Sequence, residues 1–318
     1  CRLCVLPQAS AFQAYFSKGH YKPDVVYLQE NELNQKRRLK NIYNMCHRKI
    51  THRHTKMSAL YPHEILQATI VKGEAKAACS TLSLSILGFL GGAFISLGYL
   101  AYIHVVGGMP HEWGGLAVLL GAAVFPIGLI CILIGGAELI TGNMMVLPAA
   151  WLAKKISLAA LGRNWLIVTL TNLLGAFFVA WFFGHYVGLT EGEFLHKTIA
   201  VAESKVSADF GRALVSGIGC NWMVCMGVWL CYGTQSMSGK ILGIWFPIMI
   251  FVLIGFQHVV ANMFVIPAAI WGGADISWTQ FGWNMLSVYI GNVIGGAVFV
   301  GAVYWYSYRN QLSNKNAH

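Results

Sequence analysis

The chain has 318 residues, of which 56% are hydrophobic and only 11% are charged. Soluble globular domains carry about 25% charged residues, so this composition argues against a water-soluble protein. The formal net charge of +10 would suit a nucleic-acid partner, but no folded nucleic-acid-binding motif accompanies it, and we expect no nucleic acid among the partners.

Residues 1–56 are predicted to form a basic extension outside the folded domain. They lack an apolar periodicity and contain the run QKRRLKNIYNMCHRKITHRHTK at residues 35–56. We predict that this extension is disordered or foreign to the native protein. Its histidines beside Cys46 fit no standard zinc spacing, so a solvated basic tail is favoured over a metal site. No metal or cofactor is expected in the rest of the chain.

Six segments without Asp, Glu, Lys or Arg follow. Each exceeds the roughly 20 residues that a helix needs to cross the hydrocarbon core of a bilayer. They are residues 77–111, 113–137, 164–190, 213–239, 241–274 and 276–308. We therefore predict an all-α membrane protein with six transmembrane helices, one domain over residues 57–308 and a short tail over residues 309–318. The lipid bilayer is accordingly an expected partner.

The basic residues are distributed unequally between the two sides of the predicted membrane. With six spans, both termini share one side, which then holds 19 of the 22 Lys and Arg residues. The other side holds Lys197, Lys205 and Arg212. Because basic loops are retained in the cytoplasm, we predict cytoplasmic termini and a multi-pass protein of the plasma (inner) membrane.

Several sequence blocks recur at an offset of 119 to 121 residues. GAELITGNMMVLPAAW (136–151) and GFQHVVANMFVIPAAI (255–270) share seven of sixteen residues, and NWLIVTLTNLLGA (164–176) matches NMLSVYIGNVIGG (284–296) at five positions. Three spans separate the copies, and because three is odd, the second copy must be inserted upside down. The pattern predicts a 3+3 inverted repeat, which is typical of membrane transporters.

The repeated block also contains residues that interrupt helices. Asn143 and Asn262 are good N-caps, and a proline follows each of them five residues later. We predict that spans two and five are each broken near the midplane, with a second half-helix that begins around the asparagine. Broken backbone at that depth must be buried in protein or line a cavity. Two proline kinks without function are the alternative, but kinks would not require the polar residues of the block.

These blocks resemble the formate/nitrite transporter family over roughly residues 58–308. The motifs that carry the resemblance are FLGGAFISLG (89–98), GAELITGNMM (136–145), GIGCNWMVCMGVW (217–229), GFQHVVANMFVIP (255–267) and GNVIGGAVFVG (291–301). The resemblance implies an aquaporin-like fold and a homopentamer with one pore in each protomer. It also implies conduction of small monovalent anions such as formate, nitrite or hydrosulfide.

The resemblance further implies which residues form the pore. Among them are a central histidine, the gating loop of the first break and a lysine at the extracytoplasmic vestibule. The substrate and pore positions are His258, Thr141, Asn221, Lys205, Leu139 and Ile140. The hydrophobic constrictions fall at Phe125, Leu129 and Phe251.

Four polar residues near the breaks are expected to support the loops: Glu138, Gln257, Asn143 and Asn262. Relatives commonly have glutamate before the pore histidine, where this chain has Gln257, so a relay through that carboxylate is in doubt. Glu138 is the one acidic residue deep in a predicted span. We expect it to bond backbone N–H groups of the broken loop, and a proton-relay role for it stays open.

We predict a channel or transporter for small monovalent anions, most of all formate or a similar monocarboxylate, with proton-coupled or neutral-acid passage through a hydrophobic pore that contains His258. Whether His258 gives up a proton or only a hydrogen bond stays open. Nitrite or hydrosulfide is an alternative cargo. A water or glycerol channel is a second alternative, although the predicted pore spans lack the arginine of such filters. An enzyme that pairs His258 with Glu138 is disfavoured, because no nucleophile or cofactor motif accompanies them.

Overall fold

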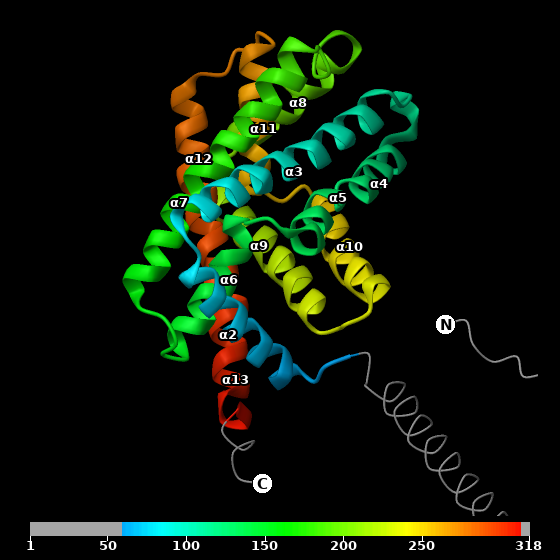
Figure 1. Cartoon of the computed structure of the whole chain (residues 1–318). Helices are drawn as coiled ribbons and strands as arrows, with labels where there is room; N and C mark the ends of the chain where they lie inside the picture. Colours follow the sequence, from blue (N-terminus) through cyan, green and yellow to red (C-terminus); the bar gives the residue numbers. More distant parts are fainter. Residues whose placement is uncertain (1–58, 313–318) are drawn as a thin grey trace, which may run out of the picture. The chain divides into compact units, whose positions relative to one another are not determined.

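The computed structural model describes residues 59–312 (Figure 1). In this range six helical segments are long and apolar enough to cross a membrane, which confirms the predicted all-α membrane fold. They are Thr81–Gly107, Gly114–Gly136, Leu158–Tyr186, Phe210–Tyr232, Met237–Ile254 and Trp278–Leu312. The prediction for residues 1–56 lies outside the described residues, as does the end of the tail.

The chain divides into two halves that contain similar elements. The first half contains α2 (Pro62–Ala78), α3 (Thr81–Gly107), η1 (His111–Trp113), α4 (Gly114–Val124), α5 (Ile127–Ile130), η2 (Cys131–Gly136), α6 (Ile140–Leu152), α7 (Leu158–Phe178) and η3 (Val179–Tyr186). The second contains η4 (Gly192–Phe194), α8 (Leu195–Val206), α9 (Phe210–Tyr232), α10 (Met237–Ile254), α11 (Val259–Trp271), α12 (Trp278–Val293), η5 (Ile294–Ala302) and α13 (Val303–Leu312). α3 packs along α7, and α9 packs along α12 in the same way (Figure 1).

Most long helices begin at a serine or aspartate whose side chain accepts a hydrogen bond from the backbone N–H three residues later. This bond satisfies one of the N–H groups that a helix start leaves without a partner. The capping residues are Ser80, Ser157, Asp209, Ser236 and Ser277.

Spans two and five are interrupted, as predicted, at residues 137–139 and 255–258. Gly136 comes directly before the first break and has a φ angle of 97°. Gly255 is the first residue of the second break and has a φ angle of 85°. Glycine adopts such angles without steric cost, so it can end the first half-helix and turn the chain. The short second half-helices, α6 and α11, are almost entirely buried in the domain.

The predicted start of each second half-helix was wrong by three residues. Asn143 and Asn262 occupy the fourth positions of α6 and α11 and do not cap them. The first N–H of α6 donates instead to the side-chain oxygen of Asn172, and the first N–H of α11 donates to that of Asn292, both at 2.9 Å. The group that satisfies the first N–H of each helix therefore comes from a neighbouring helix, α7 or α12.

Helices α3 and α7 touch through their backbones. A Cβ atom on Gly175 of α7 would lie 2.0 Å from the carbonyl oxygen of Phe89 on α3. Gly162, near the start of the same helix, has no atom within 4 Å of such a Cβ. Small residues at this crossing thus allow close approach, as is usual for helix pairs in membranes.

We expect Gly175→Ala to lower the free energy of unfolding by about 1–3 kcal/mol, because α3 and α7 must move apart to admit the methyl group. The matched control, Gly162→Ala, should leave stability unchanged or raise it by up to about 1 kcal/mol, since alanine favours helix. Thermal unfolding of the purified variants in detergent compares them. Equal melting temperatures would contradict the backbone contact.

Candidate functional site

Three cavities succeed one another between the two breaks. The largest has a volume of about 290 Å³ and includes Lys197 and Lys205 in its lining, and we call it the Lys205 vestibule. A second, with a volume of about 10 Å³, includes Lys76 and Tyr232, and we call it the Lys76 vestibule. A third, also of about 10 Å³, is the central space. A volume of this size holds about one water molecule.

The central space joins the two vestibules through shared side chains. Its lining consists of Ile95, Phe125, Leu129, Leu139, Val224, Ile248, Phe251 and His258. Phe125, Phe251 and His258 also line the Lys205 vestibule, whereas Leu129 and Leu139 also line the Lys76 vestibule. The three cavities are therefore neighbours in a row, and the middle one is apolar apart from His258.

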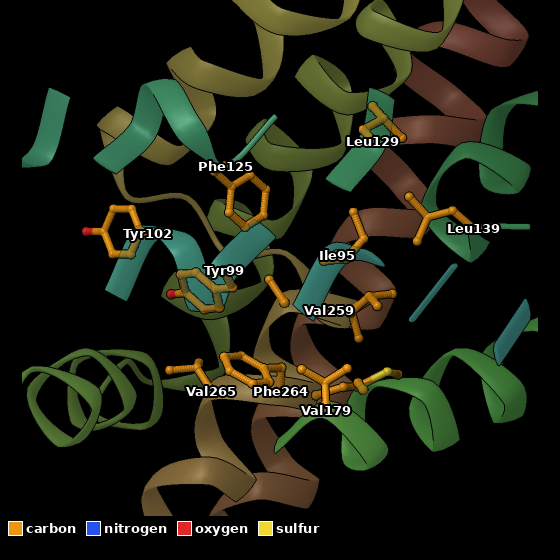
Figure 2. Close-up of a cluster of buried hydrophobic side chains, with 14 of the residues drawn as sticks. Ile95, Tyr99, Tyr102, Phe125, Leu129, Leu139, Val179, Val259, Phe264 and Val265 are labelled. Carbon is orange, nitrogen blue, oxygen red and sulfur yellow. The ribbon is translucent and has the colours of Figure 1, made fainter. Parts of the chain in front are cut away.

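The three residues predicted to form constrictions lie where the central space meets a vestibule: Phe125 and Phe251 at the Lys205 vestibule, and Leu129 at the Lys76 vestibule. Phe125 and Phe251 meet edge to face with ring centroids 5.7 Å apart. Leu129 is buried near the opposite end of the central space. Figure 2 shows Phe125, Leu129 and Leu139 around Ile95 of α3. A solute that passes through the three cavities must leave its hydration water in the vestibules.

His258 is the one polar side chain in the lining of the central space, and it forms the N-cap of α11. Its Nδ1 accepts the N–H of Ala261 at 3.1 Å, and its Nε2 lies 3.0 Å from the hydroxyl oxygen of Thr141. A backbone amide can only donate, so Nδ1 carries no proton and the neutral ring has its proton on Nε2. His258 therefore donates to the hydroxyl of Thr141, which is fully buried beside it.

The two breaks are held by equivalent asparagines. The side-chain amide nitrogen of Asn172 donates to a carbonyl of α3 at 2.6 Å and to the carbonyl of Glu138 at 2.9 Å. That of Asn292 donates to a carbonyl of α9 at 2.8 Å and to the carbonyl of Gln257 at 3.2 Å. Each break is thus fixed against the first and third spans of its own half.

Three of the expected pore residues are buried but do not line any of these three cavities, and one of them is Thr141, described above. Asn221 donates to the carbonyl oxygens of Thr141 at 3.2 Å and Asn292 at 2.7 Å, so it links the start of α6 to α12. Ile140 is the first residue of α6 and is fully buried. Both residues support the broken loops, whereas Leu139 lines the central space and the Lys76 vestibule.

Glu138 lies at the first break and forms an ion pair. One carboxylate oxygen is 2.6 Å from Nζ of Lys76, and the other accepts the side-chain amide of Asn143 at 2.8 Å. The sequence analysis placed this carboxylate on backbone N–H groups of the loop. The first N–H of α6 is already bonded to Asn172, so Glu138 uses side-chain partners instead.

Gln257 occupies the equivalent place at the second break, without a charge. Its side-chain oxygen accepts the amides of Asn262 at 2.7 Å and Asn284 at 3.0 Å, and its Nε2 donates to the carbonyl of Lys205 at 3.1 Å. The Lys205 ammonium donates to the carbonyl of Gly255 at 3.1 Å. Burial lowers the pKa of Lys205, in the short helix α8, to about 8.

Residues 63–306 match the sequence profile described as formate/nitrite transporter. The chain belongs to the formate/nitrite transporter family. The uncharacterized transporter YrhG of Bacillus subtilis is 60% identical over 251 residues, which are 79% of this chain and 94% of that protein. The formate channel BtFdhC of Bacillus thuringiensis is 53% identical over 253 residues, 80% of this chain and 97% of that channel. The formate channel FocA of Escherichia coli is 31% identical over 271 residues, 78% and 94% of the two chains.

Solved structures agree with the fold of this formate/nitrite transporter. A structure described as an FNT family ion channel aligns with a TM-score of 0.71 and 27% identity, and covers 77% of this chain and 98% of that one. A pentameric formate channel with formate bound aligns with a TM-score of 0.63 and 30% identity, and covers 72% and 97%.

Sequence reasoning did not identify Lys76 and Lys197, which line the two vestibules of this transporter. Lys76 lies in the last turn of α2 and Lys205 in the last turn of α8, and each of these helices precedes the first span of its half. The signal was therefore a basic residue shortly before each half. It escaped notice because these lysines are 129 residues apart, an offset different from that of the repeated blocks.

Proposed function

We propose that this transporter conducts formate through the three cavities, and that the charge of formate is neutralised by a proton before it crosses the central space. The observation that carries the proposal is the apolar central space between two vestibules that each contain lysine. Formate as the cargo is supported by the names of the two formate channels and of the formate-bound pentamer to which the chain is similar.

The argument for a neutral crossing is electrostatic. Removing a carboxylate from water costs several kcal/mol even after the protein relaxes, and no ammonium or guanidinium group lines the central space to offset that cost. A carboxyl group with a pKa near 4 is about one-thousandth protonated at pH 7, which corresponds to roughly 4 kcal/mol. Protonation in a vestibule is therefore comparable with or cheaper than passage of the bare anion.

His258 and Thr141 supply hydrogen bonds in the middle of this route. The Nε2–H of His258 is directed at the buried Thr141 hydroxyl, and we infer that the O–H of Thr141 turns toward the central space when a carboxyl group arrives. We propose that the imidazole acts here as a neutral donor, while the proton of the cargo comes from solvent in the vestibule.

Uptake of labelled solutes into proteoliposomes tests the proposed function. We expect rapid uptake of formate and no uptake of glycerol above that of protein-free vesicles. Nitrite, added in excess, shows by competition whether it uses the same route. Uptake of glycerol without formate would overturn the proposal in favour of a neutral-solute channel.

We further propose that the protein assembles as a homopentamer in which every protomer has its own route. The lining of the three cavities within a single chain supports independent pores, and the pentameric formate channel supports the number of subunits. Native mass spectrometry of the detergent-solubilised protein should give five times the protomer mass. A measured mass equal to that of one protomer would contradict this assembly.

Both termini are proposed to lie in the cytoplasm, because 19 of the 22 basic residues fall on that side of six spans. In a variant without its native cysteines, Ala200→Cys should react with an impermeant maleimide added to intact cells. Ile156→Cys should react only after the cells are permeabilised. The opposite labelling pattern would reverse the proposed orientation.

The titration of Lys205 predicts a pH dependence of transport. With a pKa of about 8, Lys205 holds its charge below that pH and loses it above, so its attraction for the anion fades as the pH rises through about 8. Lys205→Arg keeps the charge throughout. The ratio of wild-type to Lys205→Arg formate flux should be constant below about pH 7 and fall above it. This ratio cancels the protonation of formate, so a flat ratio up to about pH 9.5 would contradict the prediction.

A further inference from the structure

Glu138 and Gln257 occupy the same place in two equivalent hydrogen-bond frames. Asn143 donates to the carboxylate of Glu138 at 2.8 Å, and Asn262 donates to the side-chain oxygen of Gln257 at 2.7 Å. Each of these asparagines also donates to a second asparagine, on α7 or α12, at 2.8 or 2.9 Å. The frame therefore holds a carboxylate in one half and an amide in the other, and the bond from the asparagine five residues later is kept in both.

The charge beside the lysines differs as a result. Lys76 is neutralised by Glu138, at 2.6 Å in a largely buried pair. Lys205 donates only to backbone carbonyl oxygens, and within residues 59–312 neither Lys205 nor Lys197 forms an ion pair. The lining of the Lys205 vestibule contains both lysines and no carboxylate. One vestibule thus carries two uncompensated positive charges, and the other carries a compensated pair.

We propose that the Lys205 vestibule binds small monovalent anions more tightly than the Lys76 vestibule, so that the transporter has different half-saturating formate concentrations at its two faces. This inference rests on the proposed transport of formate. The ligand is a small anion whose hydration shell still allows contact with an ammonium group. The side chains at positions 138 and 257 set the difference between the two vestibules.

If transport is passive, the half-saturating concentrations and the maximal fluxes from the two faces are linked. When the central space is the slow step, each vestibule stays in equilibrium with its own solution, and the half-saturating concentration from a face equals the dissociation constant of its vestibule. Equal concentrations on both sides must give no net flux, so maximal flux divided by half-saturating concentration is the same from both faces. The face with the stronger site saturates earlier and carries the smaller maximal flux.

The test measures formate uptake from each face in proteoliposomes of uniform orientation, checked by protease access to a C-terminal tag. Labelling of Ala200→Cys identifies the face that contains Lys205. We expect the half-saturating concentration to be about fivefold lower at that face, which corresponds to about 1 kcal/mol. Equal values, or a lower value at the Lys76 face, would overturn the inference. Absence of formate uptake from both faces would instead overturn the proposed function.

Reciprocal substitutions test the assigned cause. Gln257→Glu should pair with Lys205 and raise the half-saturating concentration at that face about fivefold, and Glu138→Gln should lower it at the Lys76 face. Each variant copies the side chain that the other half already holds, and the double variant should reverse the asymmetry. If Glu138→Gln does not fold, Gln257→Glu alone tests whether these side chains cause the difference between the two faces. A folded Gln257→Glu protein with unaltered values at both faces would overturn the role of these positions.

Discussion

Replacing His258 with phenylalanine is expected to abolish formate flux. The imidazole accepts the N–H of Ala261 and donates to Thr141, and phenylalanine can do neither. A buried N–H without a partner costs about 1–3 kcal/mol, and Thr141 would lose the contact that orients its hydroxyl. The new ring would also lie beside Phe251, whose centroid is 5.8 Å from that of His258, and so lengthen the apolar junction. Uptake of labelled formate should fall at least about tenfold, the equivalent of 1.4 kcal/mol.

His258→Asn is the matched control for that substitution. Asparagine is a favoured N-cap, and its side chain offers both an acceptor for Ala261 and a donor toward Thr141. Because the histidine acts as a neutral donor in our proposal, His258→Asn should retain measurable flux with an unaltered dependence on pH. A flux that no longer responds to pH in this variant would show that the imidazole itself takes up and releases the proton.

Phe251→Ala is expected to change which acids pass. Phe251 and Phe125 form the junction between the Lys205 vestibule and the central space, and removal of one ring opens that junction. Acetate is larger than formate by one methyl group, and an apolar pocket discriminates such a difference by about tenfold or more. The ratio of acetate to formate uptake should therefore rise by about that factor.

Val252→Ala provides the comparison, because Val252 lines the wide Lys205 vestibule but not the central space. It should leave the ratio of acetate to formate near that of the wild type. Leu129→Ala, at the other junction, should act like Phe251→Ala if both junctions limit size. An unchanged ratio in Phe251→Ala would move the selective step away from this ring and toward Thr141.

The breaks in spans two and five could be predicted because their signals are local. Glycine, asparagine and proline recur in both halves at the same spacing, and each has a known effect on helices. The positions of the helix starts could not be predicted in the same way. They are fixed by Asn172 and Asn292, which are 32 and 33 residues distant in the sequence, and capping rules read only nearby residues.

The candidate site shows the same division. The resemblance to a known family identified His258, Thr141 and the apolar junction residues, and the structure brings them together. It did not reveal that Asn221 donates its amide to the carbonyl groups of Asn292 and Thr141, 71 and 80 residues away. A type of side chain at a motif position indicates burial and polarity, but its partner depends on how distant helices pack.

The paired frames around positions 138 and 257 also bear on how such a protein can evolve. In both halves, an asparagine donates to whichever oxygen the neighbouring side chain presents. A single-nucleotide exchange between glutamate and glutamine codons therefore alters the local charge while the hydrogen bond survives. Selection can thus adjust the two mouths separately without first having to rebuild the scaffold. Changes at a pair of codons can set how strongly each mouth holds an anion while the architecture stays the same.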